Sequence, residues 1–347
     1  MLFGKEMRMK IYNSKEYLMQ KVKNHKPILA YDASKDFDLW KCQAKEKLNE
    51  LLGLPFEKCD DNFEVKEKTV MSDFERIEFE FQSEEGYYIP CVMLKPLGQT
   101  KPLPTAICLQ GHTKGKHISL GEVIYEADEK SIPRSSFAVQ AVQAGYCAIA
   151  MDQRYMGMAE HDEQGRPGCI INNSALATAM MGRTAIGERV WDVQRLIDVM
   201  ETHLTDYVDK SKIICVGNSG GGTATYYAAA LEERIYMAIP SCGVCTFEES
   251  IMAMYHCSCN HIPNIRKYFE MGDIGCLIAP RKLLLVNGNQ DPIFPIEGAE
   301  TCFEVMQQAY RRCHCEENCM MRRGEGGHQF YPDIVWPIVN ENVSTLF

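Results

Sequence analysis

The sequence has no apolar run long enough to span a membrane and no surplus of basic residues. No stretch of about eighteen consecutive apolar residues occurs in the 347-residue chain, so we expect no membrane-spanning helix. Lysine and arginine together number 37 against 47 aspartates and glutamates, which gives a formal net charge of −10. Because proteins bind nucleic-acid backbones through clustered cations, this charge balance argues against nucleic acid as a partner.

The N-terminus also lacks the apolar segment of a secretory signal peptide. Lys5 and Glu6 follow only a few apolar residues, and we therefore expect a cytoplasmic protein. Its sixteen cysteines should then be reduced thiols. Cys108, Cys147 and Cys215 lie within apolar runs, where a free cysteine packs as a small hydrophobic residue.

Two segments are dense in cysteine and histidine, and neither has the paired spacing of a zinc knuckle. They are 256–261, with His256, Cys257, Cys259 and His261, and 313–319, with Cys313, His314, Cys315 and Cys319. A structural zinc ion is the more specific hypothesis for these segments. A zinc knuckle needs paired C-x-x-C motifs, however, and Cys242-x-x-Cys245 stands alone in the sequence. We therefore predict packing roles, with no bound metal or cofactor, and metal analysis of the purified protein would test this.

Short apolar runs alternate with helix-forming segments from Thr105 onward. The predicted strands are 106–109, 147–151, 213–216, 237–240, 283–286 and, more weakly, 319–322. The predicted helices between them are 135–144, 186–203, 223–231 and 297–312. This alternation predicts an α/β fold with a mostly parallel, doubly wound sheet covered on both faces.

The segment before Thr105 follows a different pattern. Residues 74–81 and 87–94 alternate apolar and polar side chains around a Glu-Gly turn, which predicts an antiparallel β-hairpin. Residues 37–52 have the spacing of an amphipathic helix, ended by Gly53-Leu54-Pro55. We therefore divide the chain into a helical N-terminal extension, residues 1–70, packed on a main α/β domain of residues 71–347.

The sharpest motif is Gly217-Asn218-Ser219-Gly220-Gly221, which lies between a predicted strand and a predicted helix. Strand, Gly-x-Ser-x-Gly and helix in this order are typical of a nucleophile elbow. A serine at the apex of so tight a turn is strained, and a Cβ two residues to either side would collide with the neighbouring strand or helix. Ser219 is therefore the predicted nucleophile. The Gly220 amide, at a helix N-terminus, is predicted to point at a developing oxyanion.

An acid and a base should follow the nucleophile in this order along the chain. Of nine histidines, only His314 and His328 follow every plausible acid. His314 ends a helical segment, whereas His328 lies in a glycine-rich loop after the last strand, so His328 is the predicted general base. Asp291, in the turn after strand 283–286, is the predicted acid that orients it, with Asp273 and Asp333 as rivals.

A second oxyanion donor should come from the loop after the first parallel strand. Gly111 allows this backbone to turn, so that the main-chain amide of His112 faces Ser219. We predict that the His112 and Gly220 amides together form the oxyanion hole, and we assign no role to the His112 imidazole.

Six blocks of the sequence resemble the α/β-hydrolase superfamily. Within it, they are similar to dienelactone-hydrolase-like and acetyl xylan esterase-like carboxylesterases, which include cephalosporin-C deacetylases. The blocks extend over about residues 74–340 and are Gln110-Gly111-His112, Asp152-Gln153-Arg154-Tyr155-Met156-Gly157, Gly217-Asn218-Ser219-Gly220-Gly221, Ile278-Ala279-Pro280-Arg281, Asn287-Gly288-Asn289-Gln290-Asp291-Pro292-Ile293-Phe294-Pro295 and Gly326-Gly327-His328-Gln329-Phe330.

The resemblance implies a Ser219, Asp291 and His328 triad in a catalytic domain of residues 71–347, with an ester as substrate. It also suggests structural roles for Asp152 and Arg154. Gln110 stands where such enzymes usually have histidine, and Asn218 where histidine, glutamate or tyrosine is frequent. Both positions border the predicted pocket, so these two departures leave the identity of the substrate undetermined.

We therefore predict a serine hydrolase that cleaves small-molecule carboxylic esters, such as acetylated sugars, through an acyl-enzyme. A peptidase or thioesterase on the same fold is the alternative within enzymes, and a catalytically inert binding protein is the alternative outside them. The oligomeric state is left open, and a homo-oligomer is compatible with the sequence. The long loops 113–134 and 155–185 are predicted to shape the pocket, the second through its methionines.

Overall fold

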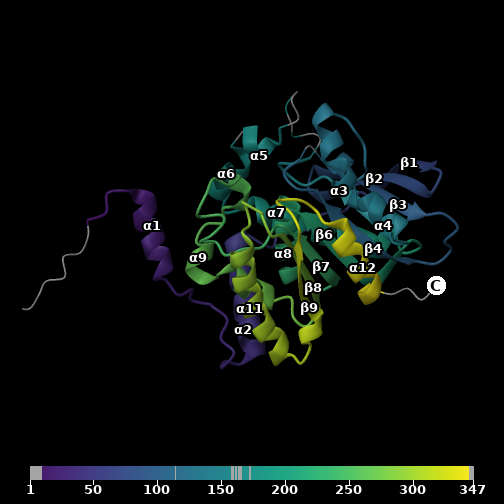
Figure 1. Ribbon diagram of the computed structural model, residues 1–347. Coiled ribbons are helices and arrows are strands. Elements are labelled where there is room, and N and C mark those ends of the chain that lie inside the picture. Colours follow the sequence, from purple (N-terminus) through teal and green to yellow (C-terminus); the bar gives the residue numbers. More distant parts are fainter. Residues whose placement is uncertain are drawn as a thin grey trace, which may run out of the picture.

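The computed structural model describes residues 10–113, 115–157, 160, 162, 166–171 and 173–343. One nine-stranded sheet organises them, in the order β1-β2-β3-β5-β4-β6-β7-β8-β9 (Figure 1). The strands are β1 (Glu64–Val70), β2 (Phe74–Glu84), β3 (Tyr87–Pro96), β4 (Leu103–Leu109), β5 (Cys147–Met151), β6 (Val208–Asn218), β7 (Ile235–Ser241), β8 (Lys282–Gly288) and β9 (Cys319–Gly324).

The sheet begins antiparallel and continues parallel. β1 pairs with β2, β2 with β3, and β3 with β5 in antiparallel register, whereas β4 to β9 pair in parallel. The predicted hairpin and all six predicted parallel strands are confirmed. From β4 the chain first adds β5 on one side and later adds β6 on the other. Ligand sites of open α/β sheets lie at such a reversal, beyond the carboxyl ends of the strands.

Helices cover both faces of this sheet, as Figure 1 shows. The helices of the described residues are α1 (Ser14–Lys23), which lies away from the sheet in Figure 1, α2 (Phe37–Leu52), α3 (Ile132–Ser135), α4 (Phe137–Gln143), α5 (Gly168–Ile171), α6 (Ser174–Ala177), α7 (Ala185–His203), α8 (Gly220–Leu231), α9 (Ile265–Tyr268), α10 (Met271–Cys276), α11 (Ile296–Arg312) and α12 (Pro332–Val343). Among the residues described, no helix is both long enough and apolar enough to cross a membrane.

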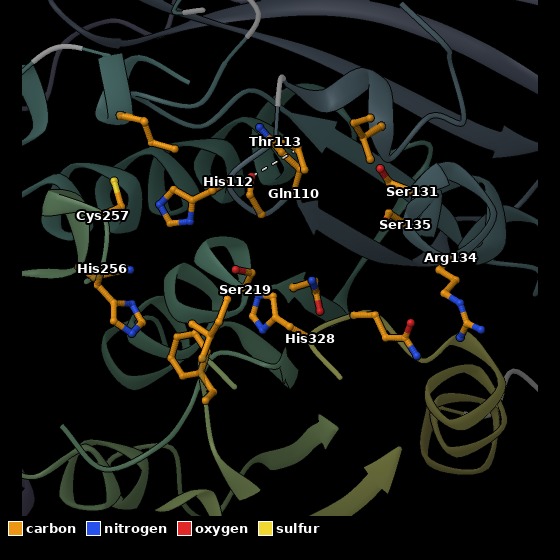
Figure 2. Close-up of a pocket in the computed structure, with 18 of the residues that line it drawn as sticks. Gln110, His112, Thr113, Ser131, Arg134, Ser135, Ser219, His256, Cys257 and His328 are labelled. Atoms are coloured by element: carbon orange, nitrogen blue, oxygen red, sulfur yellow. Dashed lines mark hydrogen bonds between the residues drawn. The ribbon is translucent and has the colours of Figure 1, made fainter. Parts of the chain in front are cut away.

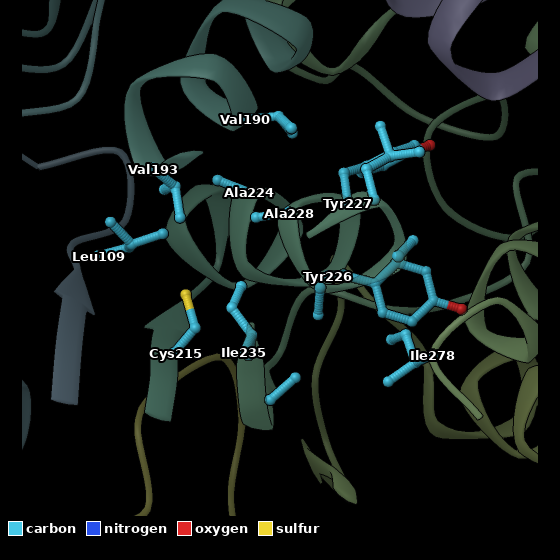
Figure 3. Close-up of a cluster of buried hydrophobic side chains, with 14 of the residues drawn as sticks. Leu109, Val190, Val193, Cys215, Ala224, Tyr226, Tyr227, Ala228, Ile235 and Ile278 are labelled. Carbon is cyan, nitrogen blue, oxygen red and sulfur yellow. The ribbon is translucent and has the colours of Figure 1, made fainter. Parts of the chain in front are cut away.

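The core consists of two layers, one on each face of the sheet. Along β4, Ile107 and Leu109 join the cluster formed with α2, α7, α8, α10 and α11, part of which Figure 3 shows. Ala106 and Cys108 point the other way and join the cluster formed with α4 and α12. Because a central strand is buried on both faces, its sequence is an uninterrupted apolar run, which made these strands predictable.

The N-terminal segment is helical only in part. Helix α2 is capped by Asp36, whose carboxylate accepts a hydrogen bond from the Leu39 amide at 2.7 Å, and Leu48 on this helix is fully buried against the core. Strand β1, however, lies inside the segment predicted to be helical and pairs with β2. Almost all of its side chains are exposed, so the strand carries no apolar alternation that would have revealed it.

The structure differs from the predicted helices by one division and by several additional helices, of which α12 is the longest. The segment predicted as one helix over 135–144 is divided at Ser136 between α3 and α4. Helix α12 was not predicted, and it contains Pro337 in its interior, a residue that ordinarily argues against a helix. Its Val335 and Val339 are fully buried, so packing onto the sheet compensates for the proline.

Candidate active site

Ser219 lies at the turn between β6 and α8, with φ 56° and ψ −124°, outside the usual region for a residue with a side chain. Its amide donates a hydrogen bond to the Ser241 carbonyl at 2.9 Å. A Cβ on Gly221 would lie 2.0 Å from the Leu109 carbonyl oxygen, and one on Gly217 would lie 2.3 Å from the Gly221 oxygen. The sequence prediction of a turn that requires glycine on both sides of the serine is confirmed.

Asp291 and His328 are brought together by the loops that follow β8 and β9. The His328 Nδ1 lies 2.8 Å from the Asp291 Oδ2. The other carboxylate oxygen, Oδ1, accepts hydrogen bonds from the Ile293 and Phe294 amides at 2.8 and 3.0 Å. Burial raises the pKa of Asp291, but His328 and these two amides outweigh it, and the net pKa lies below the ordinary value. Asp291 is therefore a carboxylate held against the Nδ1 of His328.

Ser219 and His328 line one pocket of about 620 Å³ at the carboxyl ends of the strands. Figure 2 shows their side chains next to each other, with His112, His256 and Cys257 on one side and Arg134 on the other. Phe294 stacks on the His328 ring, with centroids 5.9 Å apart and planes at 14°. This pocket has the volume of a small-molecule site.

The loop after β4 lies directly against the elbow, as predicted for an oxyanion hole. A Cβ on Gly111 would lie 2.9 Å from the Asn218 carbonyl oxygen and 3.1 Å from the Ser219 Cβ. The His112 ring packs on Gly220, since a Cβ there would lie 2.5 Å from its Cε1. The structure therefore brings both predicted donor residues beside Ser219, and their amides as oxyanion donors stay a prediction.

The His112 imidazole has a second contact that the sequence did not indicate. Its Nε2 lies 2.9 Å from the Cys259 Sγ. Burial lowers the pKa of His112, but the neighbouring thiolate of Cys259 raises it to about 9. Burial likewise raises the pKa of Cys259, whereas the thiols of Cys169 and Cys257 and the charge of Arg189 bring it well below the ordinary value.

The rival residues lie elsewhere. His314 lines a separate depression beside Arg311 and Arg312. Asp273 lies in the first turn of α10 and accepts hydrogen bonds from the Tyr31 and Glu270 amides, each at 2.7 Å. Asp333 is exposed in the first turn of α12. None of the three lines the pocket of Ser219 and His328.

Asp152 and Arg154 hold the loop after β5. Asp152 accepts hydrogen bonds from the Lys116 amide at 2.8 Å and from its ammonium at 3.0 Å. Arg154 makes two 2.8 Å hydrogen bonds to Asp192. These contacts agree with the structural roles that the resemblance suggested.

The two long loops contribute unequally to the pocket. Loop 113–134 supplies several residues that line the pocket, among them Ile118 and Arg134. Loop 155–185 supplies Ile170. The methionines of the second loop do not line the pocket in the described structure. Met156 is buried, Met180 and Met181 are exposed, and Met158 lies outside the described residues.

Reasoning from the sequence missed two pocket features. His256 lines the pocket and its Nε2 lies 3.1 Å from the Ser250 Oγ; burial lowers its pKa to about 4, so the ring is neutral. Lys130 and Arg134 place positive charge on the wall. The density of histidine and cysteine at 256–261 was the sequence signal that could have indicated His256. No sequence motif indicated that Lys130 and Arg134 line the pocket.

Known proteins resemble this chain over most of its length. The profile of the Abhydrolase family matches residues 9–323. A candidate hydrolase of Bacillus subtilis (strain 168), YtaP, is 25% identical over 242 residues, which cover 69% of this chain and 77% of that protein.

Solved structures share the fold at lower identity. A candidate acetyl xylan esterase of Bacteroides fragilis NCTC 9343 superposes with a TM-score of 0.80 at 16% identity, covering 98% of this chain and 97% of that one. A glucuronoyl esterase from Solibacter usitatus superposes with a TM-score of 0.65 at 15% identity, covering 91% and 96%. The α/β-hydrolase fold expected from the sequence is confirmed.

Proposed function

Because the chain belongs to the Abhydrolase family of α/β hydrolases, we propose that it is a serine carboxylesterase with Ser219, His328 and Asp291 as its triad. The observation that carries the proposal is their arrangement. Ser219 is held in a strained turn, and the hydrogen-bonded His328–Asp291 pair shares its pocket. Nucleophile, base and orienting acid from three loops form the constellation of acyl-transfer enzymes.

The reaction proceeds in two acyl transfers. The His328 Nε2 takes the hydroxyl proton of Ser219 while the oxygen attacks the ester carbonyl, and Asp291 stabilises the imidazolium that forms. The His112 and Gly220 amides bind the tetrahedral oxyanion. His328 then protonates the leaving alcohol, and a water molecule, deprotonated by the same nitrogen, releases the acid from Ser219.

The substrate class we propose is a small ester of a sugar, such as an acetylated one. The similar structures include proteins named as acetyl xylan and glucuronoyl esterases, and the 620 Å³ pocket has room for a sugar-sized ligand. Among the described residues that line this pocket, Lys130 and Arg134 are cationic and none is acidic. The wall therefore suits neutral or anionic esters and disfavours cationic ones.

The test combines covalent labelling with substrate profiling. A fluorophosphonate probe should modify Ser219, and Ser219→Ala should abolish labelling and lower kcat for p-nitrophenyl acetate by about 10⁴-fold or more. Ser211→Ala, which changes an exposed serine outside this pocket, should keep both. Labelling of the Ser219→Ala variant at wild-type level would refute the assignment.

Turnover of acetylated sugars, feruloyl esters, thioesters and peptides separates the remaining alternatives. The proposal expects the highest kcat/KM for an acetylated sugar. A higher value for a thioester or a peptide would replace the substrate class while leaving the nucleophile unchanged.

A further inference from the structure

Four potential metal ligands converge beside the pocket, although they come from three distant segments of the chain. The Nε2 or Nδ1 of His112 and the Sγ atoms of Cys169, Cys257 and Cys259 all lie within 4.8 Å of one another. His112 follows β4, Cys169 lies in α5, and the two other cysteines flank the short turn at Ser258. We propose that these four residues bind one structural zinc ion.

The geometry and the donor set fit tetrahedral zinc. Zinc binds thiolate sulfur at about 2.3 Å and imidazole nitrogen at about 2.0 Å, so neighbouring ligand atoms of a tetrahedral site lie about 3.5–3.8 Å apart. The ligand atoms of the four residues lie at most 4.8 Å from one another. Small side-chain rotations would bring them to the separations of a tetrahedral zinc site. Three cysteines and one histidine form a common closed zinc set, and soft thiolates favour zinc over magnesium or calcium.

A buried arginine supplies an independent argument. Arg189 is 1% exposed, and its Nε donates to the Arg154 carbonyl at 3.0 Å. Its two terminal nitrogens make no well-aligned hydrogen bond among the described residues, and the nearby Cys259 and Cys169 raise its pKa. A buried guanidinium needs a negatively charged partner. A zinc ion with three thiolates and one neutral imidazole has a net charge of −1, which this guanidinium balances.

Packing alone does not account for this cluster. Cys169, Cys257 and Cys259 are each less than 10% exposed, as small core residues would be. An imidazole and a guanidinium, however, share the same enclosure, and neither is apolar. Zinc turns these polar groups into a ligand and a counter-ion. It would also connect the three segments in a region where α5 and its neighbours offer short helices with little core of their own.

The proposed zinc site would fix the position of His112, on the side of the pocket where the oxyanion is expected to bind. The His112 ring packs on Gly220, and both His112 and Cys257 line the pocket (Figure 2). All four positions of the ion are filled by protein, so it offers no open position for a substrate and acts by positioning. The other close group, Cys242 with Asp291 and His328, is already explained by the Asp291–His328 hydrogen bond.

The first test is elemental analysis of the full-length protein, purified from zinc-supplemented cells without chelator. We expect about one zinc per chain. Replacement of zinc by cobalt(II) should give the thiolate charge-transfer band and the intense d–d absorption of a tetrahedral thiolate site. Cys259→Ser should reduce the bound metal at least about tenfold, whereas Cys313→Ser, from the other cysteine-rich segment, should retain it.

The spectroscopic readout on the wild-type protein keeps the test decisive if Cys259→Ser does not fold. Titration of the wild-type thiols with an organomercurial should then release zinc in proportion to the cysteines modified. Wild-type protein without stoichiometric zinc, and without thiolate absorption on cobalt(II) addition, would overturn the proposal. A disulfide between two of the three cysteines, found by mass spectrometry of the native protein, would overturn it as well. None of these readouts depends on esterase activity.

Discussion

Replacement of Asp291 by asparagine should disable the base while leaving its surroundings in place. Oδ1 of Asp291 accepts from two backbone amides and Oδ2 from the His328 Nδ1. The asparagine carbonyl oxygen must keep the two amides, because its NH₂ group would otherwise face two N–H donors. The NH₂ group then faces His328, whose Nδ1 must become the acceptor. The ring proton moves to Nε2, the nitrogen that should receive the proton of Ser219.

The magnitude follows from this change of tautomer. With Nε2 protonated, the ring cannot act as a base, and only binding and oxyanion stabilisation contribute to the rate. The equivalent change in serine proteases lowers kcat by about 10⁴-fold, which corresponds to about 5 kcal/mol of transition-state stabilisation. KM should change little, because the Asp291 side chain is fully buried beneath the imidazole and its residue is not among those lining the pocket.

The assay is steady-state hydrolysis of p-nitrophenyl acetate, with circular dichroism to confirm folding. Asp333→Asn changes the rival aspartate, which is exposed at the start of α12, and should keep kcat within about twofold while costing at most about 1 kcal/mol of stability. A folded Asp291→Asn variant that retains more than about a tenth of the wild-type kcat would show that the His328 tautomer does not limit the reaction.

Three further predictions concern the framework. Gly221→Ala places a Cβ 2.0 Å from the Leu109 carbonyl oxygen, so we expect a loss of about 3 kcal/mol in urea unfolding and a loss of esterase activity; wild-type stability would contradict the close approach. Leu48→Ala should cost about 2–5 kcal/mol in one cooperative transition, whereas an unchanged midpoint would mean that α2 is not part of the folded unit. Burial raises the pKa of Asp273 to about 6, so its contribution to stability is present below about pH 4 and decreases by on the order of 3 kcal/mol as the pH rises through 6. Asp273→Asn should lack this decrease, and equal slopes of stability against pH for both proteins would refute it.

The sheet was more predictable than the segments around it, for a physical reason. The parallel strands are buried on both faces, so their apolar runs, such as 213–216 and 283–286, are local signals. Strand β1 is an exposed edge strand whose partner β2 supplies its hydrogen bonds, and its own residues carry little sign of this pairing. Helix α12 depends on packing against the sheet, and that packing outweighs Pro337.

The candidate site divides in the same way. Ser219 and its glycines form one continuous motif, and Asp291 and His328 follow strands in the order that the fold requires. The convergence of His112 with Cys169, Cys257 and Cys259 could not be predicted from spacing, because the ligands lie in three segments separated by 57 and 88 residues. Because paired cysteines were sought within one segment, the sequence favoured a packing role for these cysteines over a zinc site.

The edge position of β9 has a consequence for biosynthesis. The ribosome completes β1 to β8, with the elbow and Asp291, before β9 and the His328 loop emerge, and β9 joins β8 alone. The greater part of the sheet and the nucleophile can therefore form first, and the base is added last. A chain stopped shortly before His328 would carry Ser219 without its proton acceptor. Under the proposed triad, Ser219 therefore gains His328 only after β9 has joined β8.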